Sequence, residues 1–124
     1  MNLYIDDILV YDSNINGYPD TDHDEIFFKK YNITPGRCHG LDGQVYGIPT
    51  KDDNLNILPL NRIAKYIKNF IEDASVYPEK RFLVTKIGCG LANYTPEQIA
   101  PLFKEAIELD NIHLPEEFWQ ILGE

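Results

Sequence analysis

The second half of the chain alternates between β-prone apolar runs and stretches with the spacing of amphipathic helices, and this alternation limits the possible folds more than any other feature. Residues 44–48 and 81–87 are apolar runs typical of buried strands. Between them, apolar residues recur at three- and four-residue steps over 60–74, which predicts a helix that ends before Pro78. Strands joined through helices by short connections favour right-handed crossovers and a parallel sheet. The pattern therefore predicts an α/β fold.

The first third of the chain gives weaker signals. Residues 8–11 form a short apolar run that predicts the first strand. From 15 to 43 turn dipeptides are frequent, so we expect mostly loop, with a helical turn or two over 25–31. Pro49 is expected to end the strand that starts at residue 44.

The second predicted helix has a well-marked start. Thr95 can cap it, Pro96 suits its first position, and Gln98 stands where a capping box needs a returning side chain. Pro101 removes one intrahelical hydrogen bond and should bend the first turns. The predicted order closes with two short elements, a strand over 111–114 and a helix over 115–122.

Length and composition indicate one globular domain over residues 1–124. A chain of 124 residues and 14.3 kDa has material for one core, and 44% hydrophobic and 25% charged residues lie in the globular range. The N-terminus has acids where a signal peptide is apolar, and no apolar run reaches the roughly 18 residues of a membrane span. We therefore expect a cytoplasmic protein, with Cys38 and Cys89 as free thiols.

The charge distribution argues against several classes of partner. The net charge is −9, and seven of the 20 acids lie before Lys29, in a stretch without Lys or Arg. Nucleic acid and acidic membranes are disfavoured, because proteins bind them mainly through clustered basic side chains. A small anion is compatible with the sequence, since backbone N–H groups at a helix N-terminus can hold a phosphate.

The strongest local signal is the glycine loop at residues 87–94, Ile-Gly-Cys-Gly-Leu-Ala-Asn-Tyr, which joins a buried strand to the capped helix. Gly88 and Gly90 let the backbone approach a ligand closely, and the helix start supplies N–H groups and the positive end of its dipole. Such a loop is typical of a phosphate or ribose site, and equally of a plain tight turn. Ligands of parallel sheets bind at the carboxyl ends of the strands, so we expect the 12–17 and 49–53 loops beside it.

Cysteine and histidine residues give only weak signals of catalysis or metal binding. Cys89 lies near a helix N-terminus, which lowers the pKa of a thiol, but no partner His is recognisable by spacing, so a buried structural thiol is favoured. The Asp, His and Cys residues within 22–24 and 37–40 match no zinc pattern. His113 falls within a predicted strand and is best explained as structural. We expect no metal site and no cofactor, and we assign no catalytic residue.

Five segments in order along the chain carry a further resemblance: residues 9–17, 43–51, 82–94, 99–103 and 111–115. Together they resemble a macrodomain-like family of small phage-associated bacterial proteins. The 87–91 run is also similar to the loop that wraps the diphosphate and distal ribose in the ADP-ribose-binding macrodomain superfamily. The resemblance implies a three-layer fold with a mostly parallel sheet flanked by helices. It also implies a pocket for an ADP-ribose-like or other NAD-derived nucleotide.

The resemblance places the ligand-binding residues on two walls of this pocket. The wall that faces phosphate and ribose consists of Gly88, Cys89, Gly90, Leu91, Asn93 and Tyr94. The opposite wall consists of Ser13 and Asn14, with Thr50 and Lys51 as further polar contacts. The expected partner is therefore a small nucleotide.

Two departures from the family pattern leave other functions open. Asp12 stands where the family has glycine, and Ala92 stands where ADP-ribose-removing members have an acid, so no catalytic residue is carried over. One alternative is an ADP-ribosyl hydrolase in which Asp12 or an acid within 20–24 activates water. Another is an interaction protein with a vestigial pocket, whose acidic N-terminal face binds a basic protein.

Overall fold

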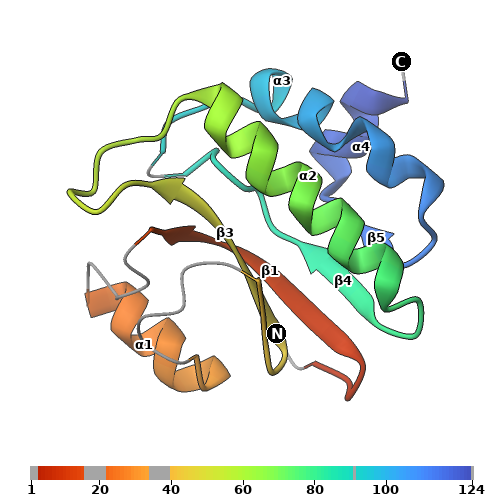
Figure 1. The fold of residues 1–124 in the computed structure, drawn as a ribbon, viewed down its shortest axis with the longest axis horizontal. Coiled ribbons are helices and arrows are strands. Elements are labelled where there is room, and N and C mark those ends of the chain that lie inside the picture. The colour runs from red at the N-terminus through yellow and green to blue at the C-terminus, as the bar shows by residue number, and fades with distance from the viewer. Residues whose placement is uncertain (1–2, 16–21, 34–39, 91, 124) are drawn as a thin grey trace.

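A computed structural model describes residues 3–15, 22–33, 40–90 and 92–123, without the side chains of 22–25. Its centre is a five-stranded mixed sheet with the strand order β2-β3-β1-β4-β5 (Figure 1). The strands are β1 (Asp7–Asn14), β2 (Gly40–Asp42), β3 (Val45–Lys51), β4 (Arg81–Val84) and β5 (Ile112–His113). The helices are α1 (Asp22–Tyr31), α2 (Leu60–Val76), α3 (Pro96–Ile99), the 3₁₀ helix η1 (Ala100–Glu108) and α4 (Glu116–Leu122).

Strand β1 lies at the centre of the sheet and runs parallel to both of its neighbours. Leu9 is paired with Val45 of β3 on one side and with Leu83 of β4 on the other. Strand β5 runs parallel to β4, whereas β2 runs antiparallel to β3. The predicted α/β fold is confirmed, with a mixed sheet in which the carboxyl ends of β1, β3 and β4 lie at one edge.

Helices cover both faces of the sheet (Figure 1). On the face covered by α2 and η1, the ring of Phe70 meets those of Phe82 and Phe103 edge to face. On the opposite face, Phe27 of α1 contacts Tyr11 of β1, with 5.2 Å between the ring centroids. The sheet therefore separates a larger core from a smaller one. None of the described helices is long and apolar enough to span a membrane.

The prediction that Pro49 ends its strand is wrong, because β3 continues through it to Lys51. The N–H of Leu9 donates to the carbonyl of Gln44. Since hydrogen bonding alternates along a strand, the even-numbered residues of β3 up to Ile48 face β1, and Pro49, which precedes the register shift at the end of β3, faces the outer edge. Strand β2 pairs with β3 only as far as Gly47. The missing N–H of Pro49 therefore interrupts no pairing with the described strands.

Two further boundaries differ from the prediction or refine it. The region 15–43, expected to be mostly loop, contains the ten-residue helix α1 and the hairpin strand β2. The predicted capping box is confirmed, since the N–H of Thr95 donates to Gln98 Oε1 over 2.9 Å. The α-helix nevertheless ends at Ile99 and continues as the 3₁₀ helix η1, because Pro101 has no N–H to extend the α-helical ladder.

Candidate functional site

Loops after three neighbouring parallel strands meet at the carboxyl edge of the sheet. Ser13 is paired with Pro49, and Asn14 with Lys51, across β1 and β3. Strand β4 lies on the other side of β1, and the 88–94 loop follows it. The structure thus brings four predicted site residues to the same edge as this loop: Ser13, Asn14, Thr50 and Lys51.

The carboxylate of Asp12 connects these three strand ends. Its Oδ2 accepts a 2.8 Å hydrogen bond from the N–H of Gly88 and a 3.3 Å hydrogen bond from Thr50 Oγ1. Thr50 is buried, with 2% of its surface exposed. The sequence offered Asp12 only as a possible acid beside the pocket. In the structure it also holds β1 against β3 and against the loop after β4.

The protein environment raises the pKa of Asp12 to about 6. The residue lies at the surface, but protein atoms crowd its carboxyl group and displace water from it, which disfavours the charged form. The hydrogen bonds from Gly88 and Thr50 and the positive charge of Lys51 oppose this rise in pKa without cancelling it. Asp12 is therefore mostly ionised at pH 7, yet it titrates close to neutrality.

Gly88 and Tyr94 fix the shape of the glycine loop. Gly88 has φ +75°, and a Cβ atom there would lie 2.9 Å from Cδ1 of Ile99, so only glycine fits without a shift. The N–H of Tyr94 donates to the carbonyl of Gly88 over 2.8 Å. The hydroxyl of Tyr94 donates to the carbonyl of Leu58 over 2.6 Å, which anchors the loop beside the start of α2.

Most of the N–H groups assigned to a phosphate cradle already donate within the protein. The N–H of Gly88 donates to Asp12, that of Cys89 to the carbonyl of Lys86, and those of Asn93 and Tyr94 to carbonyls of the loop itself. The tight turn that the sequence left open as an alternative therefore accounts for much of this loop. Gly90 and Asn93 are exposed on its outer side, whereas Leu91 lies outside the described residues.

Cys89 has the properties of a protonated thiol. Its half-buried Sγ donates to the carbonyl of Ile87 over 3.5 Å. Burial raises the pKa of this thiol, and the negative charges of Asp12 and Glu117 raise it further, against the opposing effect of Lys86. Lys86 itself forms a 2.5 Å ion pair with Glu117. A helix N-terminus therefore does not make Cys89 a thiolate at neutral pH.

Metal ligation is not supported by the part of the chain that the structure describes. There, no three His, Cys, Asp or Glu side chains gather as a metal ion would require. Cys38 and His39, which the sequence offered as weak candidates, lie outside the described residues, and so does the side chain of His23. His113 is exposed on β5.

The carboxyl edge therefore combines a carboxylate that titrates near neutrality, the positive charge of Lys51 beside it, and an exposed glycine rim at Gly90. These groups suit a small polar ligand more than a metal ion or a polyanion. Comparisons with models of protein families, with curated proteins and with solved structures gave no match for this chain.

Proposed function

We propose that the protein binds an ADP-ribose-like or other NAD-derived nucleotide at the carboxyl edge, between the loop after β1 and the 88–94 loop. The observation that carries the proposal is the Asp12 carboxylate, which holds the ends of three parallel strands together through Gly88 and Thr50. Open parallel sheets bind nucleotides at such an edge. The resemblance of the 87–91 run to macrodomain loops supports the same ligand class.

The charges at this edge suggest how such a ligand would be oriented. Asp12 is mostly ionised at pH 7 and repels phosphate groups. Ribose hydroxyls can donate to a carboxylate, so they would face Asp12. The diphosphate would then lie toward Lys51 and the rim at Gly90, where an additional side chain would meet no protein atom within 4 Å.

A second candidate activity is hydrolysis of an ADP-ribosyl bond, and the pKa of Asp12 favours it. A general base works best when its pKa lies near the operating pH, and that of Asp12 is about 6. In this reaction Asp12 takes a proton from water, and the resulting hydroxide bonds to the anomeric carbon of the ribose as the bond from that carbon to the carrier breaks. Asp12 then returns the proton to the carrier, which leaves in its protonated form. Ala92 is buried and supplies no acid at the position where the ADP-ribose-removing branch has one.

Thermal-shift and calorimetric titrations with ADP-ribose, NAD and AMP test the proposed binding. A ligand at about a hundredfold its Kd stabilises the fold by about 2.7 kcal/mol, which raises the midpoint by several degrees. We expect Gly90→Glu to abolish the shift, because the new side chain fills the open rim and repels phosphate. Val76→Glu adds the same charge at an exposed position at the far end of α2 and should leave binding intact.

Two results would overturn the proposal. One is the absence of any midpoint shift with these nucleotides. The other is a Gly90→Glu variant that folds and binds as the unmodified protein does. In either case a salt-sensitive pull-down with a basic protein would instead favour the interaction protein that the acidic N-terminal segment suggests.

A further inference from the structure

A hairpin that follows β3 extends beyond the carboxyl edge of the sheet. Its residues, 51–57, leave the end of β3 and return toward the start of α2 (Figure 1). Lys51 forms an antiparallel bridge with Ile57, and the N–H of Asp52 donates to the carbonyl of Asn56 over 2.8 Å. The backbone of the 51–57 hairpin is therefore held in place by its own pairing.

Three hydrogen bonds fix this hairpin beside the proposed nucleotide site. The N–H of Leu58 donates to the carbonyl of Thr50 over 2.9 Å, and the hydroxyl of Tyr94 donates to the carbonyl of Leu58 over 2.6 Å. The N–H of Ile15 donates to the carbonyl of Lys51 over 2.9 Å. The ends of the hairpin are thus tied to the loop after β1 and to the glycine loop after β4.

The tip of the hairpin carries a leucine in an unusual backbone conformation. Leu55 has φ +65°, in the left-handed region that bulky side chains rarely adopt. The carboxylate of Asp52 helps to impose this turn, because its Oδ1 accepts the N–H groups of Asn54 and Asn56, each over 2.9 Å. Asparagine tolerates the left-handed region and stands on both sides of Leu55. The strained position nevertheless holds an apolar residue that is 43% exposed, which points to a role outside the packing of the fold.

A second exposed apolar residue lies beside Lys51. Ile57 is 44% exposed. Residues directly opposite each other in an antiparallel pair project to the same side, so the side chains of Ile57 and Lys51 are neighbours. Burial raises the pKa of Asp12 to about 6, and the charge of Lys51 opposes this rise, so Lys51 also acts on the Asp12 carboxylate. Lys51 therefore links Asp12 to the apolar pair, which consists of Leu55 and Ile57.

The charges on the hairpin favour an uncharged group of the ligand at its tip. The side chains of Asp52 and Asp53 repel a phosphate but not an uncharged ring. In ADP-ribose the diphosphate joins the adenosine to the second ribose. In the proposed orientation, that ribose faces Asp12 and the diphosphate lies toward Lys51. The adenine base at the other end of the ligand then extends toward the apolar pair.

We infer that Leu55 and Ile57 form the subsite for the base of the nucleotide. This inference rests on the proposed function and adds the substrate class, namely a nucleotide with a heteroaromatic base rather than a sugar phosphate without one. Contact with the ring removes from water the apolar surface that the fold leaves exposed. Because the hairpin is already held by backbone hydrogen bonds, little conformational freedom is lost when the base binds.

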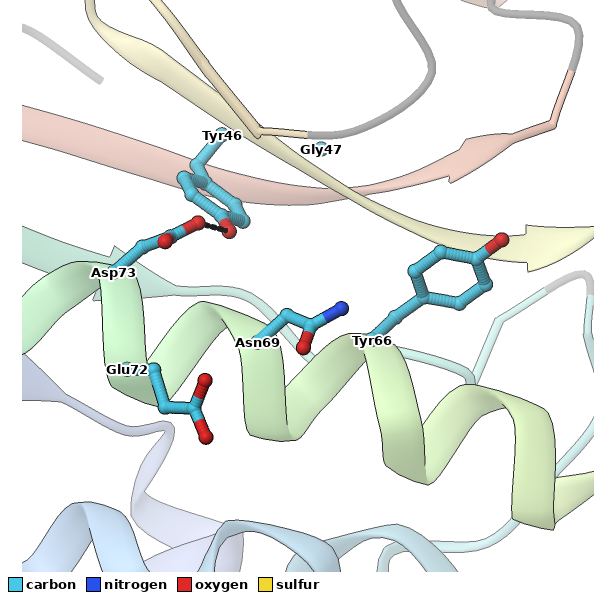
Figure 2. A pocket seen from close by; sticks show the side chains of 6 residues that line it. All are labelled: Tyr46, Gly47, Tyr66, Asn69, Glu72 and Asp73. Atoms are coloured by element: carbon cyan, nitrogen blue, oxygen red, sulfur yellow. Dashed lines mark hydrogen bonds between the residues drawn. The ribbon is translucent and has the colours of Figure 1, made fainter.

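The cavity between β3 and α2 is a less suitable place for the base. Its volume of about 230 Å³ lies below the roughly 300 to 1,000 Å³ that is typical of ligand pockets. Figure 2 shows the carboxylate of Asp73 directed toward Tyr46, whose hydroxyl donates to it. Tyr46 precedes Thr50 by four residues, which corresponds to about 13 Å along a strand. The hairpin, by contrast, begins at Lys51 itself.

Calorimetric titrations of the full chain with AMP and ribose 5-phosphate test the inference, because the two ligands differ by the base. We expect AMP to bind about 20-fold or more tightly than ribose 5-phosphate. Leu55→Asn and Ile57→Thr should each weaken the binding of AMP and of ADP-ribose about fivefold, and leave that of ribose 5-phosphate unchanged. Ile107→Thr is the matched control, since Ile107 is 42% exposed on η1, and it should change none of the three Kd values.

Leu55→Asn also separates a role in binding from a role in folding. Asparagine adopts the left-handed conformation more readily than leucine, so the variant should unfold at a urea concentration no lower than that of the unmodified protein. Weaker binding by a variant that is at least as stable cannot come from loss of the fold.

Different results overturn the inference and the proposed function. If the unmodified protein does not bind ADP-ribose, the proposed function fails and the inference fails with it. If it does bind, the inference alone is overturned when AMP and ribose 5-phosphate bind equally well, when Leu55→Asn and Ile57→Thr keep the unmodified Kd, or when Ile107→Thr weakens binding as much. A dimer that forms at high concentration and dissociates in Leu55→Asn, as measured by analytical ultracentrifugation, also overturns it, because a second copy then covers the apolar pair.

Discussion

Asp12 Oδ2 accepts the N–H of Gly88 over 2.8 Å, and this bond joins the end of β1 to the loop that follows β4. The two residues lie 76 positions apart in the sequence. The same oxygen also accepts from the buried Thr50 hydroxyl. Asp12→Ala leaves both donors without an acceptor, whereas Asp12→Asn keeps an oxygen that can accept. We expect the alanine variant to be about 1–3 kcal/mol less stable than the asparagine variant, as measured by urea unfolding.

The pH dependence of stability should reveal the raised pKa of Asp12. Because the pKa of Asp12 is about 6 in the folded protein and 3.8 for an aspartate in water, the folded protein binds the proton more tightly than the unfolded chain. The stabilising contribution of protonated Asp12 is complete below pH 3.8 and is lost as the pH rises through 6. Asp12→Asn should therefore gain stability relative to the unmodified protein between pH 4 and pH 7. Parallel stability curves for the two proteins would contradict the raised pKa.

Asp7 should show the opposite pH dependence. Its buried carboxylate accepts from Arg81 Nε over 2.7 Å and from the N–H of Tyr4 over 3.0 Å, and these bonds hold its pKa below the ordinary value. A carboxylate whose pKa is lowered by folding stabilises the folded protein at pH values above its pKa in the unfolded chain. This stabilisation is lost as the pH falls through its pKa in the folded protein. Asp7→Asn should thus lose stability at neutral pH and converge with the unmodified protein in acid. Urea unfolding of each variant over the same range of pH measures the free energy of unfolding for both aspartates.

The elements from residue 44 onward were predictable because their apolar periodicity matches the faces that the structure buries. Buried positions of α2, such as Ile63, Ile67 and Phe70, recur with the helical period. Helix α1 was underestimated because its support comes from a distant strand, through the contact of Phe27 with Tyr11. The edge position that lets Pro49 remain in β3 likewise depends on how far β2 extends, which sequence periodicity does not report.

The candidate site was predictable only at the level of topology. Parallel strands place their carboxyl ends together, so the convergence of Thr50 with the glycine loop followed from the expected sheet. The hydrogen bond from Gly88 to Asp12 joins residues 76 positions apart in the sequence, and no spacing rule predicts it.

Gly88 and Gly90 should tolerate alanine very differently. Gly88 combines φ +75° with a Cβ position 2.9 Å from Ile99, whereas a Cβ at Gly90 meets no atom within 4 Å. We expect Gly88→Ala to lower the free energy of unfolding by about 1–3 kcal/mol and Gly90→Ala to change it by about 0.5 kcal/mol or less. Urea unfolding of both variants checks this, and equal effects would show that the loop shifts to accept a side chain.

If the carboxyl edge hydrolyses an ADP-ribosyl bond, the turnover rate should follow the ionisation of Asp12. A general base must be deprotonated, so kcat should rise with pH and level off above about 6. Asp12→Asn keeps an acceptor for Gly88 and Thr50 but cannot take a proton, so turnover should fall about 100-fold or more while the Kd for ADP-ribose changes little. Release of ADP-ribose from a modified peptide measures the rate, and calorimetry measures the Kd. If the asparagine variant turns over at the rate of the unmodified protein, the general base is another residue. If both proteins bind ADP-ribose and neither releases it from the peptide, the carboxyl edge is a nucleotide-binding site alone.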